Sequence, residues 1–200
     1  MKKDAEARKV EAWTITHEMR IGRKSVVFGE NATDPKKERY ICGFYEENGL
    51  FGMYSECMGS NDYMEIMSLY IDRLKEQMEK VRGELERITV PLAPITAEQC
   101  YKNDLSQSIV DKIVAIRADI LLPEYQSAPH QLVLVTGGFG AHANARGTTV
   151  FATKLYDGEA TAYKRLDVQG EVKTEHLPAW AQERAAHIRE KEKSGHEPER

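Results

Sequence analysis

The 200-residue sequence has no long apolar run, few cysteines and no large excess of either charge. Because no stretch of about 18 apolar residues is present, we expect no membrane-spanning helix and no membrane partner. The first residues, MKKDAEARK, have no apolar core after their lysines, which argues against a secretory signal. These absences together predict a cytoplasmic protein.

The three cysteines, Cys42, Cys57 and Cys100, are widely spaced and form no CxxC pair or Cys/His cluster. We therefore expect free thiols and no zinc site. The six histidines also lack the short spacings of metal ligands, and no two carboxylates stand out as an acid–base pair. The sequence thus predicts no metal, no cofactor and no catalytic residue.

The formal net charge of -4 argues against a strong nucleic-acid-binding protein, whose surface would be basic. A local basic edge is nevertheless predicted around the second strand of the first domain. Its members are Arg23, Lys24, Lys36, Lys37 and Arg39. They are the best local candidates for a weak, direct contact with nucleic acid or with an acidic protein.

The N-terminal part predicts antiparallel strands. Residues 11–21 alternate, which is typical of a half-buried strand, and one face would carry Trp13, Ile15, His17, Met19 and Ile21. Gly22-Arg23 predicts a tight turn into a second strand at 24–28, and 39–46 predicts a third. We assign no element to residues 48–60, which are rich in glycine and aromatic residues.

A long helix is the strongest prediction. Asp62 is a suitable N-cap, and Glu65 would complete a capping box. Apolar residues then recur at alternating steps of four and three, which is a heptad seam: Met67, Ile71, Leu74, Met78, Val81, Leu85 and Ile88. Two interpretations stay open. The helix lies across the N-terminal sheet, or the seam pairs two helices and makes the protein a homodimer. A helix that overhangs the sheet could do both.

A proline-punctuated segment, Val90 to Thr96, marks the expected domain boundary. We therefore predict domains at 11–89 and 97–190, with disorder at 1–10 and 191–200. The second domain would begin with a strand at 108–117, for which a helix is the alternative.

Further strands are predicted at 131–135, 148–156 and 160–168, followed by a helix that starts near Pro178. The fold class is therefore α+β, with an N-terminal antiparallel sheet and a long helix, then a β-meander lobe and a C-terminal helix.

The stretch LVLVTGGFGAHANARG, residues 132–147, resembles a phosphate-binding turn because Gly138, Gly140 and Ala143 match G-x-G-x-x-A. Such a turn must open a helix of several turns. Here the β-branched run TTVF follows too soon, so we predict a glycine-rich hairpin loop. The loop is either purely structural or a contact surface, whose residues would be Phe139, His142, Asn144 and Arg146.

Three blocks of the second half carry a family resemblance: DKIVAIRADILLPEYQ, the run from QLVLVTGG to LDVQGEV, and LPAWAQER. They resemble an uncharacterised family of accessory-protein domains found on conjugative elements, plasmids and prophages of gut Firmicutes. The segments from THEMRIGRK to DYMEIMSLYIDRL are similar to such proteins as well. The resemblance implies a setting, the cytoplasm of a bacterial host, and no catalytic residues.

Accessory genes in that setting often counter host defence, so the resemblance implies a non-enzymatic binding protein of a mobile genetic element. The leading expectation is a counter-defence (anti-CRISPR) inhibitor that occludes a nucleic-acid-guided effector or another host nuclease. One alternative is a nucleic-acid-binding accessory or regulatory factor of the element. The other is a small enzyme whose site is built from residues distant in sequence.

Overall fold

The computed structural model describes residues 8–47 and 51–194, which divide into two compact units between Ile88 and Thr89. The division directly precedes the proline-rich segment. The expected disorder at 1–7 and 195–200 lies outside the described residues. Inside them it is wrong at both ends, because Lys9–Val10 pairs as β1 and the last helix continues to Ser194.

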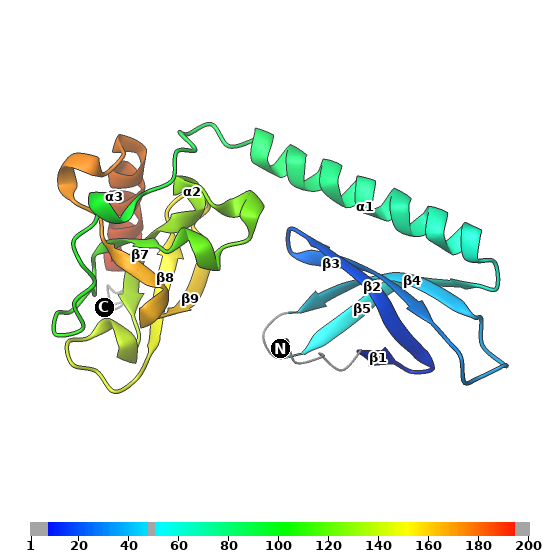
Figure 1. Ribbon diagram of the computed structural model, residues 1–200. Coiled ribbons are helices and arrows are strands. Elements are labelled where there is room, and N and C mark those ends of the chain that lie inside the picture. Colours follow the sequence, from blue (N-terminus) through cyan, green and yellow to red (C-terminus); the bar gives the residue numbers. More distant parts are fainter. Residues whose placement is uncertain (1–7, 48–50, 195–200) are drawn as a thin grey trace. The chain divides into compact units, whose positions relative to one another are not determined.

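The first unit contains an antiparallel sheet whose strands follow one another in sequence order (Figure 1). Its strands are β1 (Lys9–Val10), β2 (Trp13–Ile21), β3 (Lys24–Glu30), β4 (Tyr40–Glu47) and β5 (Gly52–Ser60). Gly22 has a φ of 62° at the turn between β2 and β3, a conformation that glycine adopts without strain. Strand β5 occupies most of the segment to which the sequence assigned no element.

The predicted single face of β2 is wrong because the strand contains a β-bulge. The register shifts between Ile15 and His17, which leaves Thr16 as an extra residue. Ile15 therefore packs beside Gly29 on the face away from the helix. His17 lies on the opposite face, with its ring 5.5 Å from that of Phe28. One inserted residue thus moves every later side chain of the strand to the other face.

The long helix α1 (Tyr63–Glu86) lies along one face of this sheet (Figure 1). As predicted, Asp62 caps it, because its Oδ1 accepts the N–H groups of Met64 at 2.8 Å and Glu65 at 3.3 Å. The reciprocal half of the capping box runs through a third residue. Ser60 Oγ accepts the N–H of Asp62 and donates to Glu65 Oε2.

The face of α1 that covers the sheet is formed by Ile66, Tyr70, Arg73, Gln77 and Val81. Ile66 and Tyr70 join the apolar core of β3 and β4, which includes Val26, Phe28, Tyr40, Cys42 and Phe44. Arg73 is buried too, and its guanidinium donates to the backbone carbonyl of Glu56 and lies over the Phe44 ring. The helix therefore packs on its sheet, as the first of the two interpretations predicted.

The second unit contains another antiparallel sheet, in the order β10-β6-β7-β8-β9. The strands are β6 (Ile113–Ile116), β7 (Leu132–Gly137), β8 (Thr149–Lys154), β9 (Ala160–Lys164) and β10 (Val168–Glu171). The predicted meander is β7-β8-β9. Two predicted strands are too long: 108–117 is a strand only from Ile113, and 160–168 is broken by a 3-10 turn at Arg165–Asp167. That turn sends the chain back to pair β10 with β6.

Both faces of this second sheet are covered. On one face the short helix α2 (Ala128–Gln131) and α3 (Ala179–Ser194) pack, with Ala181 and Ala185 fully buried. On the other face Ile109 and Ala141, from two loops, close a core with Val114, Val133 and Val150. The fold class is α+β, as the sequence predicted.

Candidate functional site

The glycine loop between β7 and β8 is a tightly packed structure. A Cβ on Gly138 would lie 2.5 Å from the carbonyl oxygen of Thr149, and one on Gly140 would lie 2.4 Å from that of Thr148. Gly138 also has a φ of 93°. These glycines are therefore required because the outgoing and returning limbs of the loop touch through their backbones. After Gly138 the chain makes only a single 3-10 turn, Phe139–Ala141, too short for a phosphate-binding helix.

A buried arginine joins this loop to a second one. Arg165 Nε donates to Asn103 Oδ1 at 3.0 Å, and its Nη2 donates to the carbonyls of Asp104 at 2.8 Å and Gln107 at 3.1 Å. Its Nη1 lies at the limit of hydrogen bonding from the carbonyls of Gly140 and Ala141, at 3.4 and 3.5 Å. These acceptors are all uncharged, so the guanidinium forms no ion pair with them. It holds the two loops together through hydrogen bonds.

Backbone bonds strengthen the same connection. The N–H of Asn144 donates to the carbonyl of Leu105 at 2.9 Å, and that of Ile109 donates to the carbonyl of Ala141 at 2.8 Å. We call residues 101–109 and 138–149 together the paired loops. Their backbones are fixed by each other and by Arg165, which preorganises whatever they present to solvent.

The paired loops present large apolar side chains to solvent. Phe139 is 80% exposed, and Leu105 is exposed as well. Around them lie the exposed polar residues His142, Asn144 and Arg146. The structure therefore brings together all four residues of the predicted contact loop and adds Leu105 from the neighbouring loop.

The electrostatics of this region depend on burial and on backbone donors. Burial lowers the pKa of Arg165 from its usual value, and the negative charge of Asp104 opposes that shift. The N–H of Ser106 donates to Asp104 Oδ1 at 2.8 Å and lowers the pKa of that carboxyl. Burial thus disfavours the charged form of Arg165, whereas the backbone donor favours the charged form of Asp104.

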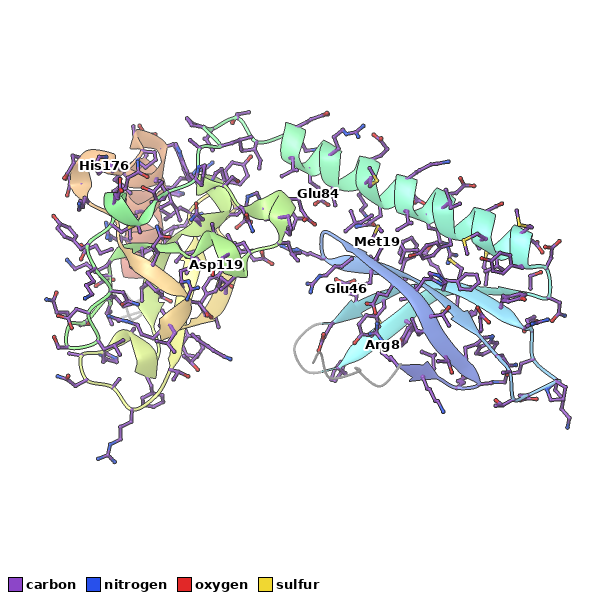
Figure 2. The ribbon with its side chains drawn as sticks, viewed as in Figure 1. Arg8, Met19, Glu46, Glu84, Asp119 and His176 are labelled. Carbon is purple, nitrogen blue, oxygen red and sulfur yellow. The ribbon has the colours of Figure 1, made fainter. Side chains whose placement is uncertain are left out.

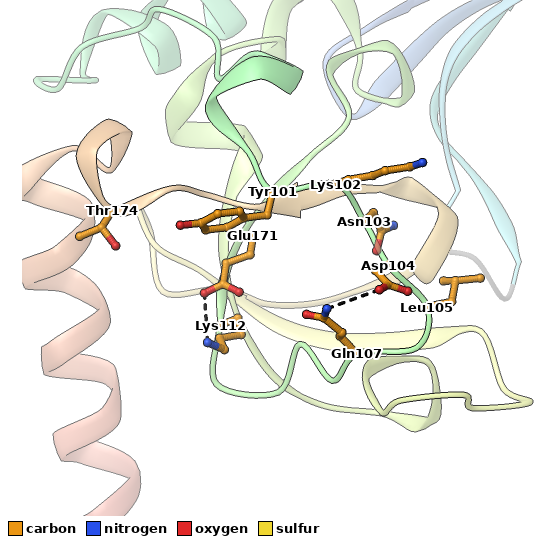
Figure 3. A pocket seen from close by; sticks show the side chains of 9 residues that line it. All are labelled: Tyr101, Lys102, Asn103, Asp104, Leu105, Gln107, Lys112, Glu171 and Thr174. Atoms are coloured by element: carbon orange, nitrogen blue, oxygen red, sulfur yellow. Dashed lines mark hydrogen bonds and ion pairs between the residues drawn. The ribbon is translucent and has the colours of Figure 1, made fainter.

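A polar hollow of about 770 Å³ lies beside the loop 101–107 (Figure 3). Lys112 Nζ and Glu171 Oε1 form an ion pair there at 3.1 Å, and Gln107 Nε2 donates to Asp104 Oδ2 at 3.4 Å. The hollow is open, and Tyr101, Lys102 and Thr174 line it as well.

The residues of the heptad seam from Met67 to Leu85 divide between the sheet and solvent. Val81 is buried against the sheet, and Met67, Leu74 and Leu85 are half-buried. Ile71 and Met78 are about half-exposed. Several of the residues that α1 buries best directly precede a seam residue in the sequence. The seam therefore lies along the side of the helix face that covers the sheet. One flank of α1 therefore stays apolar and open to solvent.

The predicted basic edge is not one surface. Arg23 and Lys24 lie at one end of β3, whereas Lys36, Lys37 and Arg39 lie beyond its other end, in the loop before β4. Two of the lysines already have carboxylate partners. Lys24 pairs with Glu46 at 3.8 Å, and Lys37 pairs with Glu11. The remaining charges are too dispersed to follow a nucleic-acid backbone.

Within residues 8–47 and 51–194, no three His, Cys, Asp or Glu side chains are grouped as a metal site would require. The three cysteines are free thiols, and of these Cys57 is exposed. In that same part of the chain, none of the helices is both long and apolar enough to span a bilayer.

Sequence reasoning missed Arg165 and Leu105. The signal for Arg165 was present, because it has the same strand phase as the half-buried Tyr163 and Thr161 and should therefore point inward. Leu105 lies in an irregular polar segment, where no periodicity indicates exposure. The class defined by these features is a two-unit α+β protein with a rigid, exposed pair of loops. No family model, curated protein or solved structure matches the chain.

Proposed function

We propose that the chain is a non-enzymatic binding protein that contacts a protein partner through the paired loops. The observation that carries this proposal is the exposure of Phe139 on a backbone fixed at both limbs. A rigid, exposed aromatic surrounded by polar groups is typical of an interface anchor, because it buries a large area and loses little conformational entropy on binding.

The composition of the paired loops favours a protein partner over nucleic acid. The exposed side chains of the paired loops include three large ones, Tyr101, Leu105 and Phe139, together with His142 and Asn144. Their exposed cations are Lys102 and Arg146, and Asp104 adds an exposed negative charge. A nucleic-acid surface would instead carry several cations in a row. The resemblance to accessory proteins of mobile elements supports host defence nucleases as the first partners to test. Inhibition would then occur by occlusion, since no catalytic group is required.

The test is direct binding to purified nucleic-acid-guided effectors and restriction nucleases, measured by interferometry after nuclease treatment of both proteins. We expect one of these partners to bind, and Phe139→Ala to weaken that binding at least about tenfold. Phe151→Ala is the matched control, because Phe151 is 52% exposed on β8 and lies outside the paired loops.

A target-cleavage assay with the bound effector then tests occlusion, and Phe139→Ala should restore cleavage. Absence of binding to every nuclease would remove the counter-defence proposal. Binding that Phe139→Ala and Phe151→Ala weaken equally would remove the assignment to the paired loops.

A further inference from the structure

Among residues 8–47 and 51–194, the outer edge of strand β2 is paired only near its start. Its outer neighbour β1 pairs only with Trp13 and Thr14, and the carbonyl of Arg8 accepts the N–H of Ile15 at 2.9 Å. The next five residues of β2, 16–20, are all exposed. Among the described residues, nothing pairs with this part of the strand. An unpaired edge is a template for another strand.

The turn after β2 determines which residues can pair outward. A two-residue turn leaves Ile21 opposite Lys24 as a hydrogen-bonded pair, and the register is regular back to His17. Bonded and non-bonded pairs alternate in an antiparallel ladder. His17, Met19 and Ile21 therefore direct their backbone groups toward β3. Glu18 and Arg20 direct theirs to the open edge.

Because these two outward residues carry opposite charges, the edge of β2 can pair with the same edge of a second copy. If two copies of β2 pair antiparallel around a twofold axis, Glu18 can face Glu18, Arg20 can face Arg20, or Glu18 can face Arg20. The first two registers place like charges opposite each other, which is destabilising. The third register places opposite charges together, and the twofold axis makes that pair twice. Glu18 already pairs with Arg8 of its own copy, and its carboxylate has further acceptor positions for Arg20 of the other copy.

We propose that a second copy of this chain adds to the edge of β2 at residues 16–20 in the third register. The sheet in the first unit of one copy and the same sheet of the other copy then form one continuous antiparallel sheet. Glu18 of each copy lies opposite Arg20 of the other, on the face away from α1. The two Met19 side chains meet on the face that α1 covers, as a non-hydrogen-bonded pair.

The position of Met19 supplies the apolar part of this contact. Met19 is 51% exposed and projects from β2 on the α1 side of the sheet (Figure 2). Helix α1 runs beside this part of β2. The ring of Tyr70 lies 6.4 Å from that of His17, and Gln77 Nε2 donates to the carbonyl of Ile21 at 3.0 Å. The dimer therefore covers Met19 next to the half-exposed flank of α1.

The self-association expected from the sequence placed the contact on the helix seam. The edge proposal differs because its specificity comes from two ion pairs in one register, and not from knobs-into-holes packing. The two contacts therefore predict different sensitivities to charge reversal on β2.

The first experiment is sedimentation velocity over a concentration series of the full chain. We expect a monomer–dimer equilibrium. Arg20→Glu and Glu18→Arg should each raise its dissociation constant about tenfold or more, because both ion pairs become like-charge pairs. Mixing the two variants should restore dimers, since every pair is then again of opposite charge. Lys36→Glu, the same charge change in an exposed loop of the first unit, should have no effect.

Cross-linking tests the register. Two opposed Met19 residues would have Cα atoms about 4.5 Å apart, close enough for a disulfide. Met19→Cys in a Cys57→Ser background should form an intermolecular disulfide on mild oxidation. Arg20→Cys in the same background should not, because position 20 faces position 18 of the second copy.

Three results would overturn the proposal. The chain could be monomeric at all concentrations. The dimer could survive both charge reversals. The dimer could be lost on Ile71→Asp while remaining insensitive to Arg20→Glu, which would place the contact on the helix seam.

Discussion

Replacement of Arg165 by methionine is the sharpest test of the way in which the paired loops are held. Methionine keeps the apolar stem and removes all donors. Three acceptors within normal hydrogen-bond distance lose their donor: Asn103 Oδ1 and the carbonyls of Asp104 and Gln107. Because these groups lie near the surface and water can replace the donor in part, each loss costs about 1 kcal/mol. The expected decrease in the free energy of unfolding of the second unit is therefore about 3 kcal/mol.

The assay is urea denaturation followed by tryptophan fluorescence. The sequence has two tryptophans, one in each unit, so Trp13→Phe leaves Trp180 as a reporter of the second unit alone. Hydrogen exchange should also accelerate across residues 101–109 and 138–149. Arg165→Lys retains the charge without the planar fork, and we expect about half of the destabilisation.

The control for this series is Arg146→Met, which removes an exposed arginine of the same loop and should change stability by less than about 0.5 kcal/mol. A decrease below about 1 kcal/mol for Arg165→Met, with unchanged exchange in both loops, would refute the reasoning that Arg165 clamps them.

Four further predictions concern stability. Asp62→Ala should lower the free energy of unfolding of the first unit by about 1 kcal/mol in urea denaturation, because two helix N–H groups lose their cap. Gly138→Ala should destabilise the second unit by about 2 kcal/mol or more, through positive φ and a clash with Thr149. Gly83→Ala, in open space on α1, should instead stabilise the first unit by about 1 kcal/mol. Burial lowers the pKa of His130, so folding favours its neutral form. The free energy of unfolding of the second unit should therefore fall as the pH decreases below about 6.5. His130→Gln should reduce this pH dependence in urea denaturation measured from pH 7 to 5.

Local patterns in the sequence predicted the regular elements well. The cap at Asp62 and the periodicity after it identified α1, because capping and amphipathicity act over a few neighbouring residues. The alternation of residues 13–21 identified β2 but assigned its faces wrongly. A bulge is decided by how the partner strand packs, here beside Gly29, and that information lies far away in sequence.

The candidate site could be predicted only in part. Phe139 and its polar neighbours were identified from their composition, since glycine-rich loops carry exposed groups. Their rigidity was not, because it depends on Arg165, which is 61 residues from Asp104 in the chain. The predicted basic edge shows the opposite error. Five cations that are close in sequence lie at the two ends of β3. The extended strand holds the first two, Arg23 and Lys24, apart from the other three.

The distribution of sulfur makes the two units chemically unequal. All seven methionines lie in the first 78 residues, and those at 19, 53, 58, 64 and 78 are exposed. Oxidation converts each of these thioethers into a polar sulfoxide. The second unit has no methionine, and its one cysteine, Cys100, is buried. Peroxide should therefore change the surface of the first unit, including the edge of β2 at Met19, while the paired loops stay chemically unaltered.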